Sequence, residues 1–198
     1  MPVSSIRVTE GSGPYLNTWQ RSISSVNRED QYVQLGEPAL PTFSAHYFPT
    51  TTTTGEHILE LMAGASVYLR ILRIAAYAND WPAAAALMEL DIRRLDTAGS
   101  GGTAQIPVPF DTADTSSATV QWSVPTPGIE GAWIGRLAVP MGTAASASDR
   151  TVVWTPEPRG KPLIIPAGTA NGLMLEPVLG VASSGLFVEV IWTETAWL

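Results

Sequence analysis

The sequence predicts an all-β protein: an antiparallel, jelly-roll-like β-sandwich preceded by an extended N-terminal arm. Apolar segments with strand character recur about every ten to fifteen residues, without helical spacers between most of them. The chain of 198 residues holds 17 Gly and 16 Pro, which restrict the length of regular elements. Its hydrophobic fraction of 45% is enough to fill the core of one domain.

The arm is expected over residues 1–55. Glycine and proline interrupt it at Gly11, Gly13, Pro14, Gly36, Pro38, Pro41 and Pro49. Its apolar side chains are too numerous for a solvated linker, so the arm should lie against its own domain or against a neighbouring subunit. Residues 50–54, a run of threonines, lead into the main domain.

Four residues of the arm are candidate interaction residues: Tyr15, Trp19, Arg21 and Tyr32. Trp, Tyr and Arg are the residue types that most often anchor protein interfaces. Docking of these side chains on the protein's own domain is the alternative to contact with a partner.

The sandwich is expected over residues 56–198. Val120, Trp122 and Val124 alternate with polar residues, and the same period of two runs through 186–193. Further segments bounded by turn residues are 57–63, 66–78, 131–139, 150–155, 162–165 and 171–181. This succession favours a sandwich or barrel over a parallel sheet.

One segment, 82–97, is ambiguous between strand and helix. Asp80 as a helix cap, the early Pro82, the alanine run and the Gly99 stop are helix signals. Met88, Leu90 and Ile92 nevertheless alternate with charged residues, which is the period of a strand. We favour a strand over about 85–96, because a lone helix would interrupt the sheet.

Composition argues against several classes of function. The net charge is −7 and no Lys/Arg run occurs, so a surface for nucleic acid or an anionic membrane is not expected. The absence of cysteine excludes disulfides and thiolate chemistry. No signal peptide is recognisable and no apolar run approaches the ~20 residues of a membrane helix, so we expect a soluble product made in the cytoplasm of a host cell.

Catalytic, cofactor-binding and metal-binding residues are not predicted, and the chain is not expected to be an enzyme. His46 and His57 lack metal-ligand spacing, and no serine stands in a nucleophile-elbow motif. Carboxylates pair in sequence at Glu56 with Glu60, Glu89 with Asp91, and Asp111 with Asp114. Solvated strand faces and surface turns explain them better than a glycosidase dyad.

The tryptophans fall into two groups. Trp122, Trp154 and Trp192 lie on the apolar phase of their strands and are expected in the core. Trp81, Trp133 and Trp197 are the side chains to test first for contact with a sugar.

Several segments together resemble tailed-bacteriophage virion proteins of the jelly-roll decoration (cement) or head-fibre kind. They are residues 18–21 (TWQR), 30–33 (DQYV), 57–66 (HILELMAGAS), 94–103 (RLDTAGSGGT) and 161–172 (KPLIIPAGTANG). The resemblance implies a place in the virion and threefold-symmetric assembly on capsids. It implies no active-site residue.

The expected function is therefore that of a capsid decoration protein on the outer surface of the phage head. It would form a homotrimer and clamp neighbouring subunits of the major capsid protein, stabilising the shell by mass action. Deletion of residues 1–55 is expected to leave the rest folded but weakly bound to capsids. The alternative is a receptor- or carbohydrate-binding module of a fibre, neck or tail.

Overall fold

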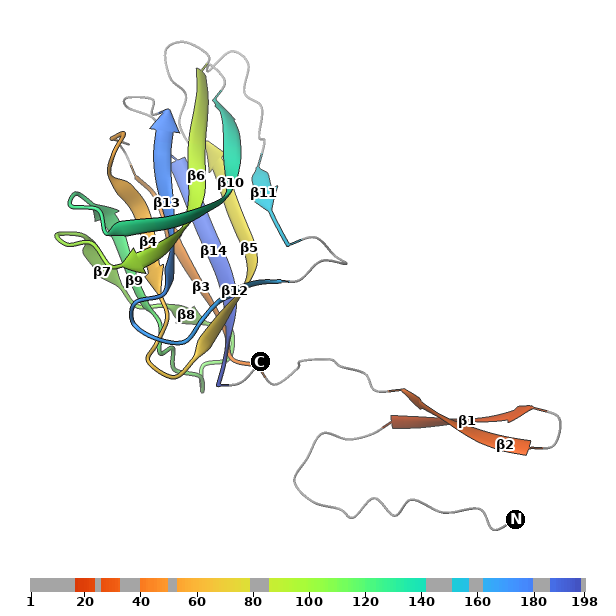
Figure 1. Ribbon diagram of the computed structural model, residues 1–198. Helices are drawn as coiled ribbons and strands as arrows, with labels where there is room; N and C mark the ends of the chain where they lie inside the picture. The colour runs from red at the N-terminus through yellow and green to blue at the C-terminus, as the bar shows by residue number, and fades with distance from the viewer. Residues whose placement is uncertain are drawn as a thin grey trace. The chain divides into compact units, whose positions relative to one another are not determined.

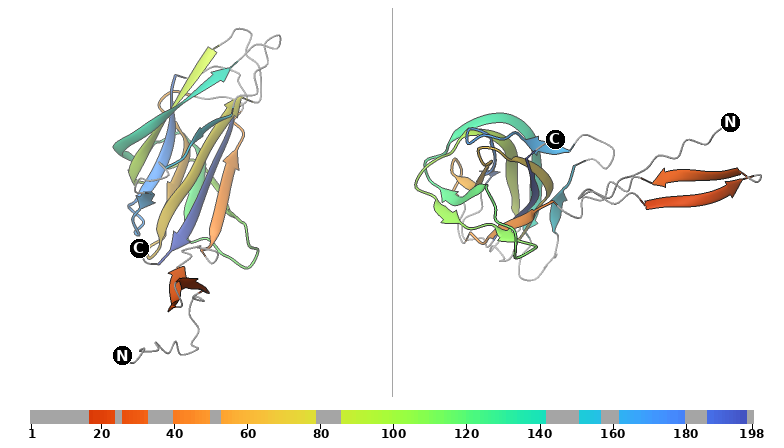
Figure 2. Two further views of the ribbon diagram at one scale, coloured as in Figure 1. Left: turned by 90° about the vertical axis from the view of Figure 1, so that its right-hand side faces the viewer. Right: turned by 90° about the horizontal axis from the view of Figure 1, so that it is seen from below.

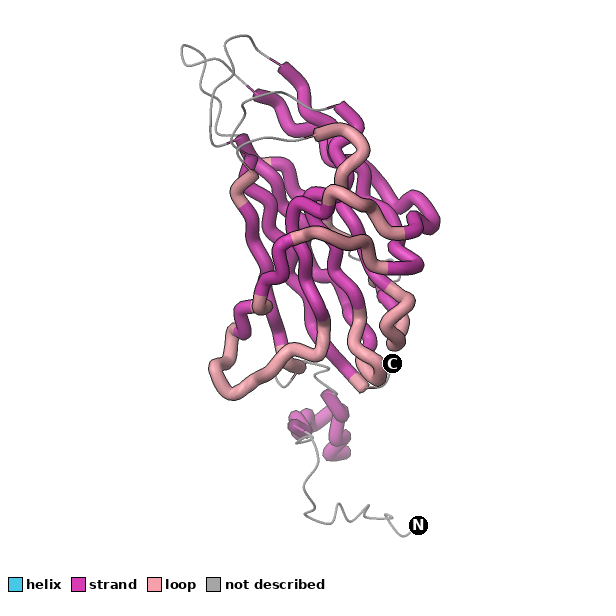
Figure 3. The backbone as a smooth tube through the Cα atoms, turned by 90° about the vertical axis from the view of Figure 1, so that its left-hand side faces the viewer, coloured by secondary structure: helices cyan, strands magenta, loops and turns pink. Residues whose placement is uncertain are grey.

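The computed structural model describes residues 17–23, 26–32, 40–49, 53–78, 86–141, 151–156, 162–179 and 186–196. The chain divides into two compact units, Met1–Ala39 and Leu40–Leu198. All regular elements in the described ranges are strands, as Figure 3 shows, so the predicted all-β fold is confirmed. Those ranges contain no helix that could cross a membrane.

The first unit holds one antiparallel hairpin, formed by β1 (Asn17–Ile23) and β2 (Val26–Tyr32). The sequence predicts an extended arm here and does not predict this pairing. The reason lies in β2, whose residues VNREDQY are mostly polar or charged and therefore lack the apolar alternation by which strands are recognised.

The second unit consists of two antiparallel sheets (Figure 1). The first sheet has the order β10 (Ile129–Met141), β6 (Ala86–Thr97), β13 (Gly172–Leu179), β4 (His57–Met62), β9 (Thr119–Val124) and β7 (Thr103–Gln105). The second sheet has the order β11 (Val152–Trp154), β5 (Tyr68–Ala78), β14 (Leu186–Thr195), β3 (Thr42–Tyr47) and β8 (Val108–Pro109). A short strand, β12 (Leu163–Ile165), also pairs with β5.

The strand orders are those of a jelly roll. Four strands, β4, β13, β6 and β10, form the body of one sheet, and β3, β14, β5 and β11 form that of the other. Consecutive strands mostly pass from one sheet to the other, which gives the two interlocked Greek keys of this fold. Strands β7, β8 and β9 are an insertion between β6 and β10 that widens both sheets beside β4 and β3.

The core lies between the two sheets and is built by alternate residues of each strand. Every second residue of β14 from Leu186 to Trp192 is fully buried, and Phe43 of β3 packs against the Trp192 ring at 6.0 Å. Trp122 is buried as well, and Trp154 packs at the margin of the core. The predicted core position is thus confirmed for Trp122 and Trp192, whereas Trp154 is only half-buried.

Strand β6 settles the ambiguity of segment 82–97 in favour of a strand. Met88, Leu90 and Ile92 are completely buried, while Glu89 and Arg93 lie on the opposite face. Burial of an alternating apolar face stabilises the extended chain, and this outweighs the helix propensity of the residues.

The division between the units differs from the predicted arm of residues 1–55. Strand β3 pairs with β14 and β8, and its Phe43 and Ala45 are 0% exposed. Residues 40–49 therefore belong to the sandwich, and the boundary lies at residue 39. Pro41 and Pro49 flank β3 closely, which made this strand resemble the interrupted segments before it.

Candidate functional site

The most concentrated group of polar side chains lies on the outer face of the first sheet, where the first half of β10 crosses it (Figure 1). The pairing of β10 with β6 is irregular at three places between Ile129 and Gly135. Such bulges bend and twist a strand. Glu130 is thereby carried over the sheet to within reach of β4.

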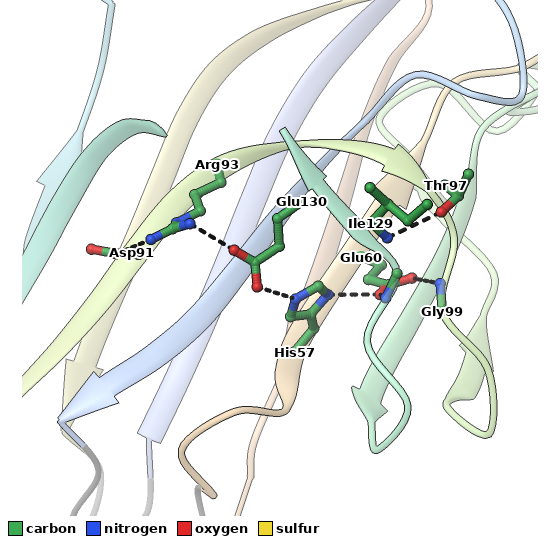
Figure 4. A network of polar contacts seen from close by, with 9 residues as sticks. His57, Glu60, Asp91, Arg93, Thr97, Gly99, Ile129 and Glu130 are labelled. Atoms are coloured by element: carbon green, nitrogen blue, oxygen red, sulfur yellow. Dashed lines mark hydrogen bonds and ion pairs between the residues drawn. The ribbon is translucent and has the colours of Figure 1, made fainter. Parts of the chain in front are cut away.

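Glu60 of β4 is the centre of the group, and its side chain is only 1% exposed. One carboxylate oxygen lies 2.7 Å from His57 Nδ1 and accepts a hydrogen bond of 3.1 Å from the Gly128 N–H. The other accepts a bond of 2.7 Å from the Gly99 N–H. Three chain segments thus meet at one buried carboxylate (Figure 4).

Gly99 and Gly128 can approach Glu60 because neither carries a side chain. A Cβ atom on Gly128 would lie 1.8 Å from the Thr97 carbonyl oxygen. On Gly99 it would lie 2.3 Å from the Thr126 carbonyl oxygen. These contacts are with backbone, which cannot move aside as a flexible side chain can.

His57 lies between two carboxylates (Figure 4). Its side chain is 0% exposed, and its Nε2 atom is 3.6 Å from Glu130 Oε1. Burial alone would lower the pKa of His57, but the hydrogen bonds and negative charges of Glu60 and Glu130 outweigh it and raise the pKa above 6.5.

Glu60 shows the reciprocal effect. Burial would raise its pKa, but the hydrogen bonds from His57, Gly99 and Gly128 outweigh burial and lower the pKa. The geometry therefore favours an ion pair of imidazolium and carboxylate beneath the surface.

The group continues from Glu130 toward the edge of the sheet. Arg93 lies 2.6 Å from Glu130 and 3.3 Å from Asp91. Asp91 also accepts a bond of 2.6 Å from Arg136, whose guanidinium reaches Glu89 at 2.6 Å. Burial would raise the pKa of Asp91, but bonds from Arg136, Trp133 and Arg93 lower it. We call this series from Glu60 to Glu89 the charged network.

The charged network joins strands and has few free groups for other chemistry. Its carboxylates accept bonds from histidine and arginine side chains of β4, β6 and β10. They also accept bonds from the N–H groups of Gly99, which follows β6, and Gly128, which precedes β10. Among the residues that the structure describes, no set of three or more His, Asp or Glu side chains is placed to hold a metal ion. The arrangement is one that fixes β10 across the sheet.

A second buried carboxylate, Glu194, also joins two chain segments through hydrogen bonds, on the second sheet. Glu194 of β14 is 5% exposed and accepts hydrogen bonds from the Ser116 hydroxyl, the Ser117 N–H at 2.8 Å and Trp192 Nε1 at 3.2 Å. It thereby ties the segment before β9 to the end of β14.

Neither the burial of Glu60 nor the contacts of Glu194 were predicted from the sequence. His57 and Glu60 are three residues apart, a spacing that in a regular strand places side chains on opposite faces. They nevertheless meet at 2.7 Å, although the register between β4 and β9 is constant from His57 to Met62. The sequence carries no signal of this contact.

The predicted carboxylate pairs have separate places. Glu89 and Asp91 share one face of β6, as expected, and both bind Arg136. The expectation that this face is solvated was wrong for Asp91, which is only 2% exposed. Asp111 accepts a bond from the Ala113 N–H and forms the expected surface turn with Asp114. Glu60 is the buried centre described above, and Glu56 lies before β4.

The predicted interaction residues lie in the first unit. Trp19 and Arg21 are on β1, where they pair in register with Asp30 and Arg28, and Tyr32 ends β2 opposite Asn17. Tyr15 lies outside the described residues. Their role in binding stays a prediction.

Of the three tryptophans singled out for a sugar, Trp133 lies on the first half of β10 and is 58% exposed. Trp81 and Trp197 lie outside the described part of the chain. No protein-family model matches this chain, and its sequence matches no curated protein.

Proposed function

We propose that the chain is a non-enzymatic structural protein of a tailed-bacteriophage particle, a capsid decoration protein that trimerises and clamps neighbouring subunits of the major capsid protein. The observation that carries the proposal is the division into a jelly-roll body and a separate N-terminal unit that holds a hairpin. Two linked units that each contact a different subunit gain affinity through their high effective concentration.

The segments that resemble phage decoration proteins contact one another in the folded chain, which supports the proposal. Glu60 in segment 57–66 binds Gly99 in segment 94–103. The same segment 57–66 is joined to segment 161–172 by the bond from the Ala63 N–H to the Asn171 carbonyl, 2.8 Å, and by a second between Gly168 and Gly64. Segments that join strands in this way are typical of residues that specify a fold.

The use of the charged groups also supports a structural role. The buried His57 and Glu60 are occupied with each other and with backbone donors, and Asp91 is held by two arginines. The net charge of −7 suits the outer surface of a shell, where no DNA is in contact.

Binding to capsids tests the proposal directly. Purified full-length protein, mixed with expanded capsids that lack decoration protein, should bind in a fixed ratio and raise the melting temperature of the shell. A matched mixture with unexpanded shells controls for nonspecific adsorption. If no fixed ratio appears and the shell melts unchanged, the chain is not a decoration protein.

A receptor- or carbohydrate-binding module is the second candidate, and one observation favours it. Trp133 is 58% exposed beside Asp91 and Arg136, so an aromatic face stands next to charged hydrogen-bonding groups. Exposed aromatic rings with such neighbours are suited to bind a sugar. Glycan-array binding by the wild type that a Trp133→Ala variant loses would support this function, whereas Leu87→Ala, at another exposed apolar residue, serves as the control.

A further inference from the structure

The first part of β10, residues 129–133, lies on the outer face of the first sheet without burying any of its own side chains. None of these residues is buried, whereas Leu137 and Val139 farther along the strand are 2% and 0% exposed. Figure 2 shows β10 curving around the outside of the sandwich. A segment with few buried apolar contacts opens more easily than the core beside it. We call residues 129–133 the flap.

Polar contacts anchor the flap to the sheet. The Ile129 N–H donates a hydrogen bond of 3.0 Å to Thr97 Oγ1. The Glu130 carboxylate lies 2.6 Å from the Arg93 guanidinium and 3.6 Å from His57 Nε2 (Figure 4). The anchoring of the flap therefore depends in part on the charge of His57.

Both ring nitrogens of His57 face carboxylate oxygens. Its Nδ1 atom lies 2.7 Å from Glu60, and its Nε2 atom, which faces Glu130, has no hydrogen-bond partner in the described part of the chain. A neutral imidazole carries hydrogen on one nitrogen only, so the other nitrogen would direct its lone pair at a carboxylate. The imidazolium form therefore suits both neighbours, and its loss would turn attraction of Glu130 into repulsion.

The other charges around His57 add to this effect. Glu176 of β13 is paired in register with Asp91, and burial and the charge of Glu130 raise its pKa against the opposing positive charges nearby. On β9, the residue opposite His57 is the uncharged Val124. The charged groups around His57 are Glu60 on its own strand, Glu130 on β10, Glu176 on β13 and Arg93 on β6. Loss of the imidazolium charge would leave carboxylates in excess and repel Glu130 from the sheet.

Apolar side chains lie beneath the flap. Met62, Leu95 and Met174 form a buried cluster separate from the main core, and each is at most 4% exposed. Leu95 is paired in register with Glu130 of the flap. Lifting the flap would expose these side chains to water, so a charged surface would be replaced by an apolar one.

We propose that the flap is a proton-controlled cover, which stays closed on the first sheet while His57 carries a proton and opens when His57 loses it. Opening uncovers Met62, Leu95 and Met174. Because closure favours the protonated imidazole, protonation must favour closure to the same extent. The inference is independent of the proposed function, since it concerns a single copy of the chain.

The direction with pH follows from the same contacts. Burial would lower the pKa of His57, but Glu60 and Glu130 raise it above 6.5. The flap should therefore be closed below pH 6.5 and open as the pH rises through the raised pKa. Glu176 acts in the same sense, because it gains its negative charge as the pH rises.

Hydrogen exchange of the full chain between about pH 6 and about pH 9 tests the proposal. After correction for the intrinsic pH dependence of exchange, protection of the flap amides should fall by about tenfold or more, because a charged contact is lost. Amides of β14 in the core should keep their protection over the same range.

Oxidation of methionine by dilute peroxide reports whether the cluster beneath the flap is uncovered. Met62 and Met174 should be oxidised about tenfold faster at the higher pH. Met88, which is 0% exposed in the main core, should stay protected. Oxidation of Met88 in step with Met62 would indicate unfolding of the whole sandwich and would overturn the proposal.

Glu130→Gln separates the flap from the buried ion pair. It removes the carboxylate that His57 attracts and leaves the contact between His57 and Glu60, so the pH dependence of flap protection should disappear. Glu89→Gln is the matched control, because Glu89 is also a carboxylate of the charged network but binds Arg136, and it should retain the wild-type dependence. Circular dichroism verifies that each variant is folded.

Two results would overturn the proposal. The first is a wild-type flap with the same protection at both pH values. The second is a Glu130→Gln variant that keeps the wild-type decline in protection. Since exchange is measured without capsids, either result leaves the proposed function untouched.

Discussion

Glu60 illustrates how single residues hold this sandwich together. A carboxylate with almost no solvent contact is tolerable only when hydrogen bonds replace its water. Two glycine N–H groups and the His57 ring supply them. Since His57 in turn lies near Glu130, protonation of one imidazole is linked to the position of β10.

Stability should therefore depend on pH in two directions. The pKa of His57 is raised. The stability that protonated His57 contributes is therefore complete below pH 6.5 and is lost as the pH rises through the raised pKa. The pKa of Glu60 is lowered. The stability that ionised Glu60 contributes is therefore present above pH 4.5 and is lost as the pH falls through the lowered pKa. Maximal stability is expected between these two limits.

Thermal unfolding across pH measures this dependence. His57→Gln removes the positive charge, should cost about 3 kcal/mol at pH 6, and should abolish the decline of stability on the alkaline side. His46→Gln, on the exposed part of β3, controls for loss of a histidine. An alkaline decline that survives in His57→Gln would refute the role of His57.

A methyl group at Gly128 should be far more harmful than one at Gly135. A Cβ on Gly128 meets the Thr97 carbonyl at 1.8 Å, whereas on Gly135 its nearest neighbour is Trp154 at an ordinary 3.5 Å. We expect Gly128→Ala to cost about 3 kcal/mol and Gly135→Ala less than about 1 kcal/mol. Chemical denaturation measures the free energy of unfolding of both variants. Equal losses of stability in the two variants would contradict the packing described for Gly128.

At the scale of elements, the sequence was informative wherever a strand has one buried and one exposed face. The alternation of apolar and polar residues in β6, β9 and β14 could be recognised in the sequence, because each of these strands packs one face against the core. Strand β3 was missed because only Phe43 and Ala45 show the alternation between two prolines. The charged network was missed because Glu130 reaches it through the bulges between β10 and β6, and bulges arise from pairing between distant strands.

The segment before β9 should loosen when Glu194 loses its charge. In Glu194→Gln the side-chain nitrogen cannot accept the bond from the Ser117 N–H, so one buried donor is left unsatisfied at a cost of about 2 kcal/mol. Hydrogen exchange at Ser117 and Ala118 should accelerate. Glu89→Gln is the control, because Glu89 is a more exposed ion-pair partner and its loss should leave these amides protected. Unchanged exchange in Glu194→Gln would contradict the role of Glu194 in holding the segment before β9.

For the whole molecule, the boundary at residue 39 changes what a truncation should do. Residues 40–198 retain β3 and should unfold at about the temperature of the full chain. Residues 56–198 lack Phe43 and Ala45 and expose the edge of β14, so this fragment should aggregate or melt many degrees lower. Calorimetry measures the melting temperature of both fragments. A well-folded 56–198 fragment would contradict the boundary at residue 39 and support the boundary at residue 55 predicted from the sequence.

We propose that this chain decorates a phage capsid, and a cryo-electron microscopy reconstruction of the intact particle would test that proposal without any further assumption. We expect density for the jelly-roll body on the outer surface of the head, in groups of three, with the N-terminal unit reaching a neighbouring capsid subunit. Density for the chain confined to the tail or a receptor-binding fibre, or absent from the particle, would contradict it.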